Sequence, residues 1–396
     1  MLYYELIKYN LERRQPIVNL RELLGKRIRD ARVQLALTQE DLAKQVGFPV
    51  AQIISQIERG QREIKAWELV KLAQALRFDI ADLLATEEPA PHPEILWRES
   101  PKGNKKLIEA EFIQRCQQYA LLEHLCEISA QQSLPSRDIN LASMSFSDAE
   151  DFGDEIRAQF KLGVRPAASL LTNLEATYGV KLWYRNLGEE GSAASIVAHF
   201  GAAILMNSSE APWRRNFNFG HEVFHLLTWQ SIPMQLLQKD AALKDKIEKL
   251  ASAFASSLLL PGDELKLAFE RHIKDGKIDY TDIIGIAREF DVSTSALLYR
   301  LRGLRLLKKE TVQSLLDDPA FRALDRATIR PLWWTPPEIP ERFVRLAFTA
   351  YQKGKLSRAR LAQFLNTSLI DLTDTLLEYG LDDREDYKTD ISTTRC

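Results

Sequence analysis

The stretch NFGHEVFHLLTW, residues 218–229, places two histidines four residues apart, with a glutamate directly after the first. Residues i and i+4 share one face of a helix, so His221 and His225 can each offer an imidazole nitrogen to one ion. Glu222 stands beside them, close enough to take a proton from water at that ion without being a ligand itself. Because the chain holds only six histidines in 396 residues, we expect a metal-binding helix rather than two partly buried, hydrogen-bonded histidines.

A pair of histidines needs a third protein ligand to complete a zinc site. Zn²⁺ takes N, S and O donors in tetrahedral geometry, and catalytic sites keep one position open for water. The stretch IEKLASAFASSLLLPGDEL, residues 247–265, predicts a second helix that starts at about Glu248, 23 residues past His225. The small residues Ala251 and Ala255 would let this helix approach the first. Glu248 is therefore the expected third ligand, and the alternative is a solvated helix glutamate.

Between about Glu155 and the histidine helix, the sequence predicts a mixture of helices and strands. Two helices are expected within residues 158–180. Three strands rich in β-branched and aromatic residues follow them, over residues 180–185, 194–200 and 202–207. Phe200–Gly201 is the expected turn of a hairpin, whose edge could hold a substrate chain in extended form. These elements predict an α+β fold that is mostly helical.

Residues 20–86 predict five short helices, of which two have a specific pattern. In LTQEDLAKQVGFPVAQIISQIERG, residues 37–60, Thr38 is an expected N-cap with Asp41 completing a capping box. Gly47 ends that helix and Pro49 opens the next, as in a helix-turn-helix motif. Over about 65 residues this region resembles the phage-repressor (xenobiotic-response-element) helix-turn-helix family.

The resemblance implies that the second helix of the motif contacts DNA. Apolar residues and proline occupy its first positions, where family members usually carry polar residues. The polar candidates for DNA contact are Gln39, Lys44, Gln52, Ser55, Gln56 and Arg59. The alternative is that the same fold serves dimerisation or docking to another protein.

The sequence predicts four parts: 1–86, a helix-turn-helix domain; 87–154, a linker and connector; 155–305, the metal-binding domain; and 306–396, a helical C-terminal domain. Residues 87–103, rich in proline and polar residues, predict the linker itself. A long helix is expected from Lys105 onward, as a packed connector or, alternatively, as the coiled coil of a homodimer.

The spacing of residues 37–57 returns in two later stretches, residues 282–301 and 356–376, and Gly47 corresponds to Asn366 in the last of them. Both residues tolerate a left-handed turn. We expect the two later copies to be packing units, with DNA reading as the alternative.

Composition limits the setting in which the protein works. The net charge of -2 excludes a global polybasic attraction to nucleic acid, so any basic patch must be local. Cys116, Cys126 and Cys396 form no CxxC pattern, which is typical of a reducing compartment. The chain has no apolar stretch long enough to span a membrane, and its first residues lack a signal-peptide core. A cytoplasmic protein with no membrane partner is expected.

The motifs around the two predicted site helices resemble those of the ImmA/IrrE family of zinc peptidases. They read Arg214-x-x-Phe217-x-x-x-HExxH-Leu-Leu after a strand ending in Asn207, then Glu248-x-x-Ala251-x-x-Phe254-Ala255-x-x-Leu-Leu-x-Pro261. The resemblance covers roughly residues 155–305. It implies a zincin-like domain in which His221, His225 and Glu248 bind zinc and Glu222 is the general base. Members of that family cleave a partner transcriptional repressor, and many are fused to this same helix-turn-helix.

Two positions depart from the family pattern. Phe224 stands where the family usually has glycine, and its bulk beside the metal is expected either to narrow the cleft or to block it. Ser252 stands where the family usually has asparagine or aspartate. The donor that would stabilise the oxyanion is not identified, and the candidates are His199, Arg214 and Tyr299.

Two functions remain open at this point. The leading one is a DNA-associated zinc endopeptidase that cleaves a helix-turn-helix repressor. The alternative is a transcription regulator or antitoxin in which the metallopeptidase-like domain acts as a sensor or docking module without cleavage. The intact histidine motif with Glu248 favours the enzyme, and Phe224 favours the alternative.

Overall fold

The structure is a computed structural model that describes residues 20–35, 37–76, 78, 80–84, 93–102, 104–189, 191–232, 237, 239–328 and 334–383. These residues belong to two units. The N-terminal unit comprises Met1–His92 with Gly103–Arg115, and the C-terminal unit comprises Pro93–Lys102 with Cys116–Cys396. The fold is mostly helical with one small mixed sheet, which confirms the predicted α+β class.

The N-terminal unit contains the five helices that the sequence predicts. They are α2 (Leu20–Gln34), α3 (Gln39–Val46), α4 (Gln52–Glu58), α5 (Ala66–Leu76) and α6 (Ile80–Leu84). Their apolar faces meet in one core that includes Ile28, Leu42, Ile54 and Leu72, each 0% exposed.

The turn between α3 and α4 follows the capping rules. The Thr38 hydroxyl accepts from the Asp41 amide, the Asp41 carboxylate accepts from the Thr38 amide, and Gly47 takes φ 83°. The prediction that Pro49 opens the second helix is wrong. The first α-helical carbonyl acceptor of α4 is that of Ala51, which bonds to the Ser55 amide, so Pro49 belongs to the turn.

The C-terminal unit is built on a four-stranded sheet in the order β1-β3-β4-β2. The strands are β1 (Leu96–Trp97), β2 (Lys181–Arg185), β3 (Ala193–Ala198) and β4 (Gly201–Asn207). Strand β3 is antiparallel to both neighbours, whereas β2 and β4 are parallel. The predicted strands and hairpin are confirmed, but the turn is His199–Phe200 rather than Phe200–Gly201, because Gly201 pairs with Ala198 as the first residue of β4.

Strand β1 lies in the segment that the sequence predicts as a linker, and at Leu96–Trp97 that prediction is wrong. The two side chains are 6% and 4% exposed. Burial of this apolar pair against the sheet outweighs the polar and proline-rich composition around it.

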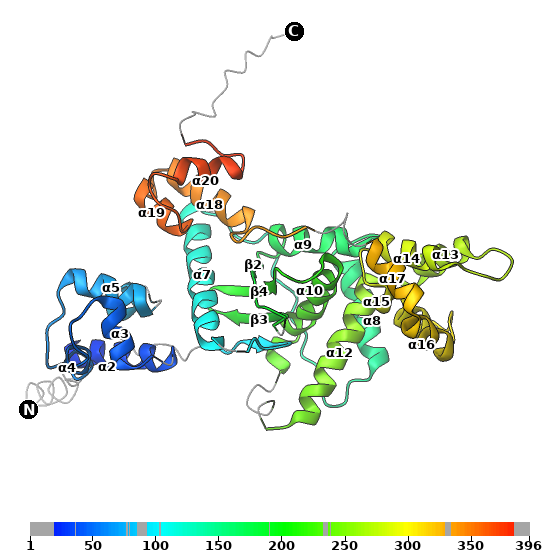
Figure 1. Cartoon of the computed structure of the whole chain (residues 1–396), viewed down its shortest axis with the longest axis horizontal. Coiled ribbons are helices and arrows are strands. Elements are labelled where there is room, and N and C mark those ends of the chain that lie inside the picture. Colours follow the sequence, from blue (N-terminus) through cyan, green and yellow to red (C-terminus); the bar gives the residue numbers. More distant parts are fainter. Residues whose placement is uncertain are drawn as a thin grey trace, which may run out of the picture. The chain divides into compact units, whose positions relative to one another are not determined.

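Helices cover both faces of the sheet (Figure 1). On one face, α10 (Pro212–Leu227) packs Phe219 and Val223 into the core that holds Ile204 and Met206. On the other face, Trp183 lies with its ring centroid 6.1 Å from that of Tyr119, on α7 (Lys105–Cys126). The predicted long helix is thus confirmed, although it ends at Cys126, where Glu127 takes a positive φ of 60°.

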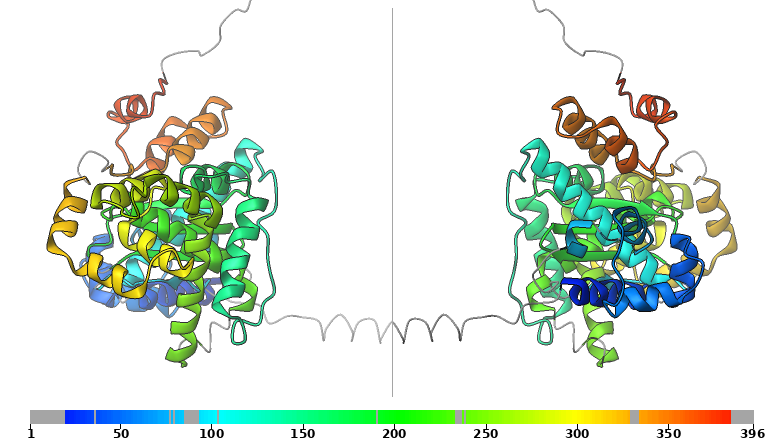
Figure 2. Two further views of the ribbon diagram at one scale, coloured as in Figure 1. Left: turned by 90° about the vertical axis from the view of Figure 1, so that its right-hand side faces the viewer. Right: turned by 90° about the vertical axis from the view of Figure 1, so that its left-hand side faces the viewer.

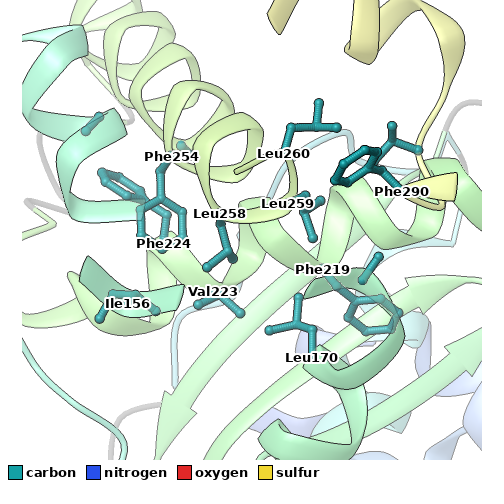
Figure 3. Close-up of a cluster of buried hydrophobic side chains, with 14 of the residues drawn as sticks. Ile156, Leu170, Phe219, Val223, Phe224, Phe254, Leu258, Leu259, Leu260 and Phe290 are labelled. Atoms are coloured by element: carbon teal, nitrogen blue, oxygen red, sulfur yellow. The ribbon is translucent and has the colours of Figure 1, made fainter. Parts of the chain in front are cut away.

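Three more helices surround α10: α8 (Phe146–Gln159), α9 (Pro166–Ala176) and α12 (Ala241–Leu259). Helix α12 does not start at Glu248, as predicted, but seven residues earlier at Ala241, because the Asp240 side chain caps the Leu243 amide. The predicted approach of α12 to α10 is confirmed, since a Cβ built on Gly220 would lie 3.3 Å from the Cβ of Ala255. The leucines and phenylalanines at this junction form one cluster (Figure 3).

The remaining helices are α13 (Gly262–His272), α14 (Tyr280–Glu289), α15 (Thr294–Gly303), α16 (Lys309–Asp317), α17 (Pro319–Ala327), α18 (Glu341–Gln352), α19 (Arg358–Phe364) and α20 (Leu372–Glu378) (Figure 2). Both predicted repeats are helix pairs, α14–α15 and α19–α20, with left-handed turns at Asp291 (φ 54°) and Asn366 (φ 51°). Among the helices of the described ranges, none has the length and apolar character that crossing a membrane requires.

Candidate metal centre

The structure brings together the three residues that the sequence predicts as metal ligands. His221 and His225 lie one turn apart on α10, and Glu248 faces them from α12. Nε2 of His221 lies 3.0 Å from Oε2 of Glu248 and 3.1 Å from Nε2 of His225. Nε2 of His225 lies 3.7 Å from Oε1 of Glu248. The donor atoms therefore surround one point and could hold a metal ion.

The donor spacing fits a small tetrahedral cation. An ion with bonds of roughly 2.0–2.1 Å holds its donors about 3.4 Å apart, close to the separations found here. The chemistry of the donors fits as well. Burial lowers the pKa of His221 well below its usual value and that of His225 to about 3, so both imidazoles are neutral, as metal ligands must be.

Close packing of α10 on α12 sets this geometry. Gly220 precedes the first histidine and leaves room for Ala255 and Leu259 of α12. The helix is buried along its whole second half, from Asn218 to Leu227. A rigid, buried helix pair fixes ligand directions more strictly than a loop would.

Glu222 is completely buried beside the ligands. Its side chain is 0% exposed, and within the described part of the chain neither carboxylate oxygen has a hydrogen-bond partner of good geometry. Burial raises the pKa of Glu222 to about 8, and the nearby Ser195 hydroxyl offsets part of that rise. A buried carboxyl without a partner is costly unless a ligand or water satisfies it, so Glu222 is placed to hydrogen-bond a water or ligand held at this centre.

Ser252 takes part in the site through His221. Its hydroxyl lies 3.3 Å from Nδ1 of His221 and donates to the backbone oxygen of Glu248 at 2.9 Å. The hydroxyl can then accept from Nδ1–H, which directs the lone pair of Nε2 toward Glu248. A ligand histidine is commonly oriented by a hydrogen bond to its other nitrogen, and serine supplies that bond here where the family usually has asparagine or aspartate.

The Phe224 side chain faces the core, although its ring centroid also lies 5.8 Å from that of His225, so its effect on the cleft stays a prediction. Its ring is 0% exposed and packs 6.4 Å from the ring of Phe152 and 5.5 Å from that of Phe254. Figure 3 shows it among these core side chains. Its bulk therefore fills the space between α8, α10 and α12, because the hydrophobic gain of burial favours that direction.

One residue of the site was missed by sequence reasoning. Arg98 follows β1, and its guanidinium donates to Oδ1 of Asn218, one turn ahead of Glu222 on α10. Its positive charge acts to lower the pKa of all four groups, although burial, the larger effect, raises the pKa of Glu222 and Glu248. Arg98 lies 123 residues before His221 in a segment that reads as a linker. The apolar pair Leu96–Trp97 was the one signal of order there.

The three candidates for stabilising the oxyanion make other contacts. His199 is exposed in the hairpin turn, where it packs on Phe200. The Arg214 side chain is 54% exposed and pairs with Glu210 at 2.9 Å and Glu99 at 3.5 Å. Tyr299, on α15, lies under Arg302.

The residues expected to contact DNA fall into two groups. Lys44, Gln52 and Gln56 are exposed, and the last two lie one turn apart on α4. Others are held within the unit: the Gln39 amide donates to Glu58 at 2.8 Å, and Arg59 donates to the hydroxyl of Ser55 at 2.8 Å. Buried Glu58 also binds Arg32, so Gln39 is oriented by a fixed network.

The cysteines on α7 are buried and free. Cys116 and Cys126 form no disulfide, and Cys396 lies outside the described residues.

Comparison with known proteins identifies two domains. Residues 175–302 match the peptidase family described as the IrrE N-terminal-like domain, and residues 28–83 match the helix-turn-helix family. No curated protein matches the chain. One similar solved structure is Bacillus thuringiensis PlcR in complex with the peptide PapR7 and DNA, at 12% identity, covering 91% of this chain and 93% of that one. Its TM-score of 0.16 is too low to support any argument. The chain thus carries an IrrE-like domain of a peptidase family behind an N-terminal helix-turn-helix domain.

Proposed function

We propose that this protein is a DNA-associated zinc endopeptidase that cleaves a partner helix-turn-helix repressor and so relieves repression. The observation that carries the proposal is the convergence of His221, His225 and Glu248 beside the buried carboxyl of Glu222, inside an IrrE-like domain. The donor set and spacing suit zinc better than a hard cation such as Mg²⁺, which prefers oxygen donors.

Each residue of the site has a separate role in the proposed reaction. His221, His225 and Glu248 hold the ion, and Ser252 orients His221. Zinc, when bound, polarises a peptide carbonyl and acidifies water. Glu222 takes a proton from the attacking water and returns it to the leaving amine. Its buried setting favours the protonated form, which helps it to hold that proton between the two transfers.

The N-terminal unit would place this activity at DNA, in the cytoplasm. We assign base contacts to Gln52, Ser55 and Gln56, and phosphate contacts to Lys44 and Arg59. Gln39 lies at the same DNA-binding surface and supports these contacts. Such local contacts do not require a basic chain overall. A homodimer would match the two-fold symmetry of a palindromic site.

A second function rests on one specific observation. His221, Glu222 and His225 are 1%, 0% and 0% exposed, and Glu248 is the most accessible of the four, with 21% of its side chain exposed. A polypeptide cannot reach the centre in this conformation. A regulator or antitoxin that senses a metal or docks a partner without cutting it would have no need of access.

Comparison of the wild type with Glu222→Gln in cells tests the proposal. Glutamine keeps the shape of the side chain but cannot accept the proton, so the fold and metal content should persist while cleavage stops. Quantitative proteomics with mapping of new protein N-termini should show one helix-turn-helix repressor cut in the wild type and intact in the variant. Glu155→Gln, an exposed carboxylate paired with Arg137, is the matched control and should behave like the wild type. Identical repressor levels and termini in wild type and Glu222→Gln would leave the regulator as the better function.

A further inference from the structure

Residues 93–102, here called the strap, have an unusual place in the chain. They belong to the C-terminal unit, although the chain on both sides of them belongs to the N-terminal unit. They also lie outside the residues that match the IrrE-like family. The strap is therefore a segment of the C-terminal unit, where it forms β1, and its neighbours in sequence belong to the N-terminal unit.

The strap is bound to β3 as an added antiparallel strand (Figure 1). Leu96 pairs with Ser195 and Trp97 with Ala194. The Arg98 amide donates to the carbonyl of Ala193 at 3.1 Å, and the Ser192 amide donates to that of Glu99 at 3.2 Å. Main-chain bonds of this kind, with side chains alternating between two faces, are how an extended peptide binds a sheet edge.

The strap lies directly beside the metal centre. Its partner strand β3 packs against α10, the helix that carries His221 and Glu222. The Arg98 side chain crosses to Asn218 on α10, where it also lies over the ring of Phe217, 5.6 Å from its centroid. Asn218 is 1% exposed and donates to Ser192, the residue before β3, and to Glu210. Arg98 therefore ties the strap to the helix that carries Glu222.

The edge of β3 is otherwise the natural place for a substrate. Strand β3 runs antiparallel to both β1 and β4. One edge of β3 pairs with β4, so a peptide can pair only with the edge that faces β1. A peptide that lies extended next to Glu222 would need the edge that Leu96–Glu99 now occupy. The near-complete burial of His221 and Glu222 agrees with a closed site.

We propose that residues Ser192–Ser195, which lead into and begin β3, form the peptide-docking edge of the metal centre, and that the strap is its resident occupant. An extended polypeptide replaces the strap when it binds. The occupant that fits is a strand with two consecutive apolar or aromatic residues followed by a basic residue, because Leu96, Trp97 and Arg98 fill those positions. This inference rests on the proposed function for its consequence, cleavage, but not for the docking itself.

A reversible cross-link between the strap and β3 tests the exchange. Trp97 and Ala194 form a pair without mutual hydrogen bonds, next to the bonded pair of Arg98 and Ala193. Paired residues of this kind lie about 4.5 Å apart at Cα, within the range of a disulfide. In the full-length Trp97→Cys/Ala194→Cys variant, oxidation should lock the strap in place and reduction should release it.

The probe is a fluorescein-labelled peptide of residues 93–102, measured by fluorescence polarisation on metal-free protein. We expect at least tenfold tighter binding to the reduced than to the oxidised double-cysteine protein. Arg98→Ala should bind the peptide at least tenfold more tightly than the wild type, since its strap has lost the bond to Asn218. Arg165→Ala, a surface arginine paired with Asp291, should match the wild type.

Hydrogen exchange gives a second measurement that needs no ligand. In Arg98→Ala, amides of the strap and of residues 192–195 should exchange at least tenfold faster, while β2 and β4 remain protected. Equal peptide binding to oxidised and reduced protein, or exchange in the strap as slow as in β4 for both proteins, would show that β1 is a permanent strand. Neither measurement depends on catalysis. A protein that binds the peptide but cleaves nothing would therefore contradict the proposed function and still support the docking edge.

Discussion

At the scale of single residues, the candidate metal centre depends on neutral donor groups that are buried from solvent. Burial keeps both imidazoles uncharged and raises the pKa of Glu248, the one ligand that can become negative. The Ser252 hydroxyl lies at Nδ1 of His221, which leaves Nε2 free to bind an ion. Each of these roles predicts a different loss when the side chain is removed.

The purified protein should contain about one zinc per chain. His221→Ala or Glu248→Ala should lose most of it, because two remaining ligands cannot hold the ion. Ser252→Ala should keep all three ligands but weaken zinc binding roughly 10–100-fold, since His221 loses its orienting partner. Metal analysis and competition with a zinc chelator measure both effects. Full zinc content in Glu248→Ala would remove that residue from the site.

A residue away from the site should control the pH dependence of stability. Burial raises the pKa of Glu175 to about 7, with Arg342 opposing the rise and Glu341 adding to it. A carboxyl with a raised folded pKa favours folding at low pH, and that contribution disappears as the pH rises through about 7. Glu175→Gln should therefore gain about 1–3 kcal/mol over the wild type at pH 8 and little at pH 4. Urea unfolding at the two pH values measures the difference, and an equal effect at both would contradict the shifted pKa.

The ligands could be predicted from the sequence because helix periodicity converts a spacing of four into a shared face. Arg98 could not, because its position depends on a strand pairing across about a hundred residues. The direction of the Phe224 side chain also had to come from the structure. Sequence spacing gives its place on α10, but only the packing of Phe152 and Phe254 shows that its side of the helix faces the core.

At the scale of secondary-structure elements, the site is held by helices that touch through glycine. A Cβ on Gly153 of α8 would lie 2.6 Å from the backbone oxygen of Phe254 on α12. Backbone at that distance cannot move aside cheaply. The close contact of α8 with α12 therefore needs glycine at this position.

A pair of glycine substitutions should separate close packing from helix propensity. Gly153→Ala should destabilise the protein by about 1–3 kcal/mol through overpacking. Gly285→Ala lies in α14, where an added Cβ meets no atom within 4 Å of it, and should stabilise by about 0.5–1 kcal/mol. Chemical denaturation measures both. If both substitutions destabilised the protein, or both stabilised it, the packing described for α8 and α12 would be contradicted.

Most elements could be predicted because each carries local signals. Thr38 and Asp41 form the expected box, and Gly47 and Asn366 take the expected left-handed turns. The failures are at places where a local signal competes with a distant one. Asp240 starts α12 earlier than the run of apolar residues suggested, and Leu96–Trp97 pair with a strand far along the chain.

At the scale of the whole molecule, the chain combines a helix-turn-helix domain with an IrrE-like domain of a peptidase family. The four-part division of the chain stays a prediction. The strap adds one feature that the family matches do not cover, since it belongs to the second unit while its neighbours in sequence belong to the first.

Binding to DNA should depend steeply on salt, because phosphate contacts release counterions. Gln52→Ala should cost roughly 1–3 kcal/mol at one base position, whereas Lys44→Ala should weaken binding to all sequences alike. Full-length protein in a binding assay against genomic fragments, repeated at several salt concentrations, measures both. Absence of binding at low salt would favour protein docking by the helix-turn-helix domain.

We propose above that Glu222 accepts a proton from water at a zinc ion held by His221, His225 and Glu248, and that this water cleaves a repressor. The most direct measurement mixes purified zinc-loaded protein with the repressor found in cells and follows intact mass over time. The wild type should yield two fragments whose masses add up to the repressor plus one water, and Glu222→Gln with equal zinc content should yield none. An uncut repressor with both proteins, or equal cutting by both, would contradict the claim.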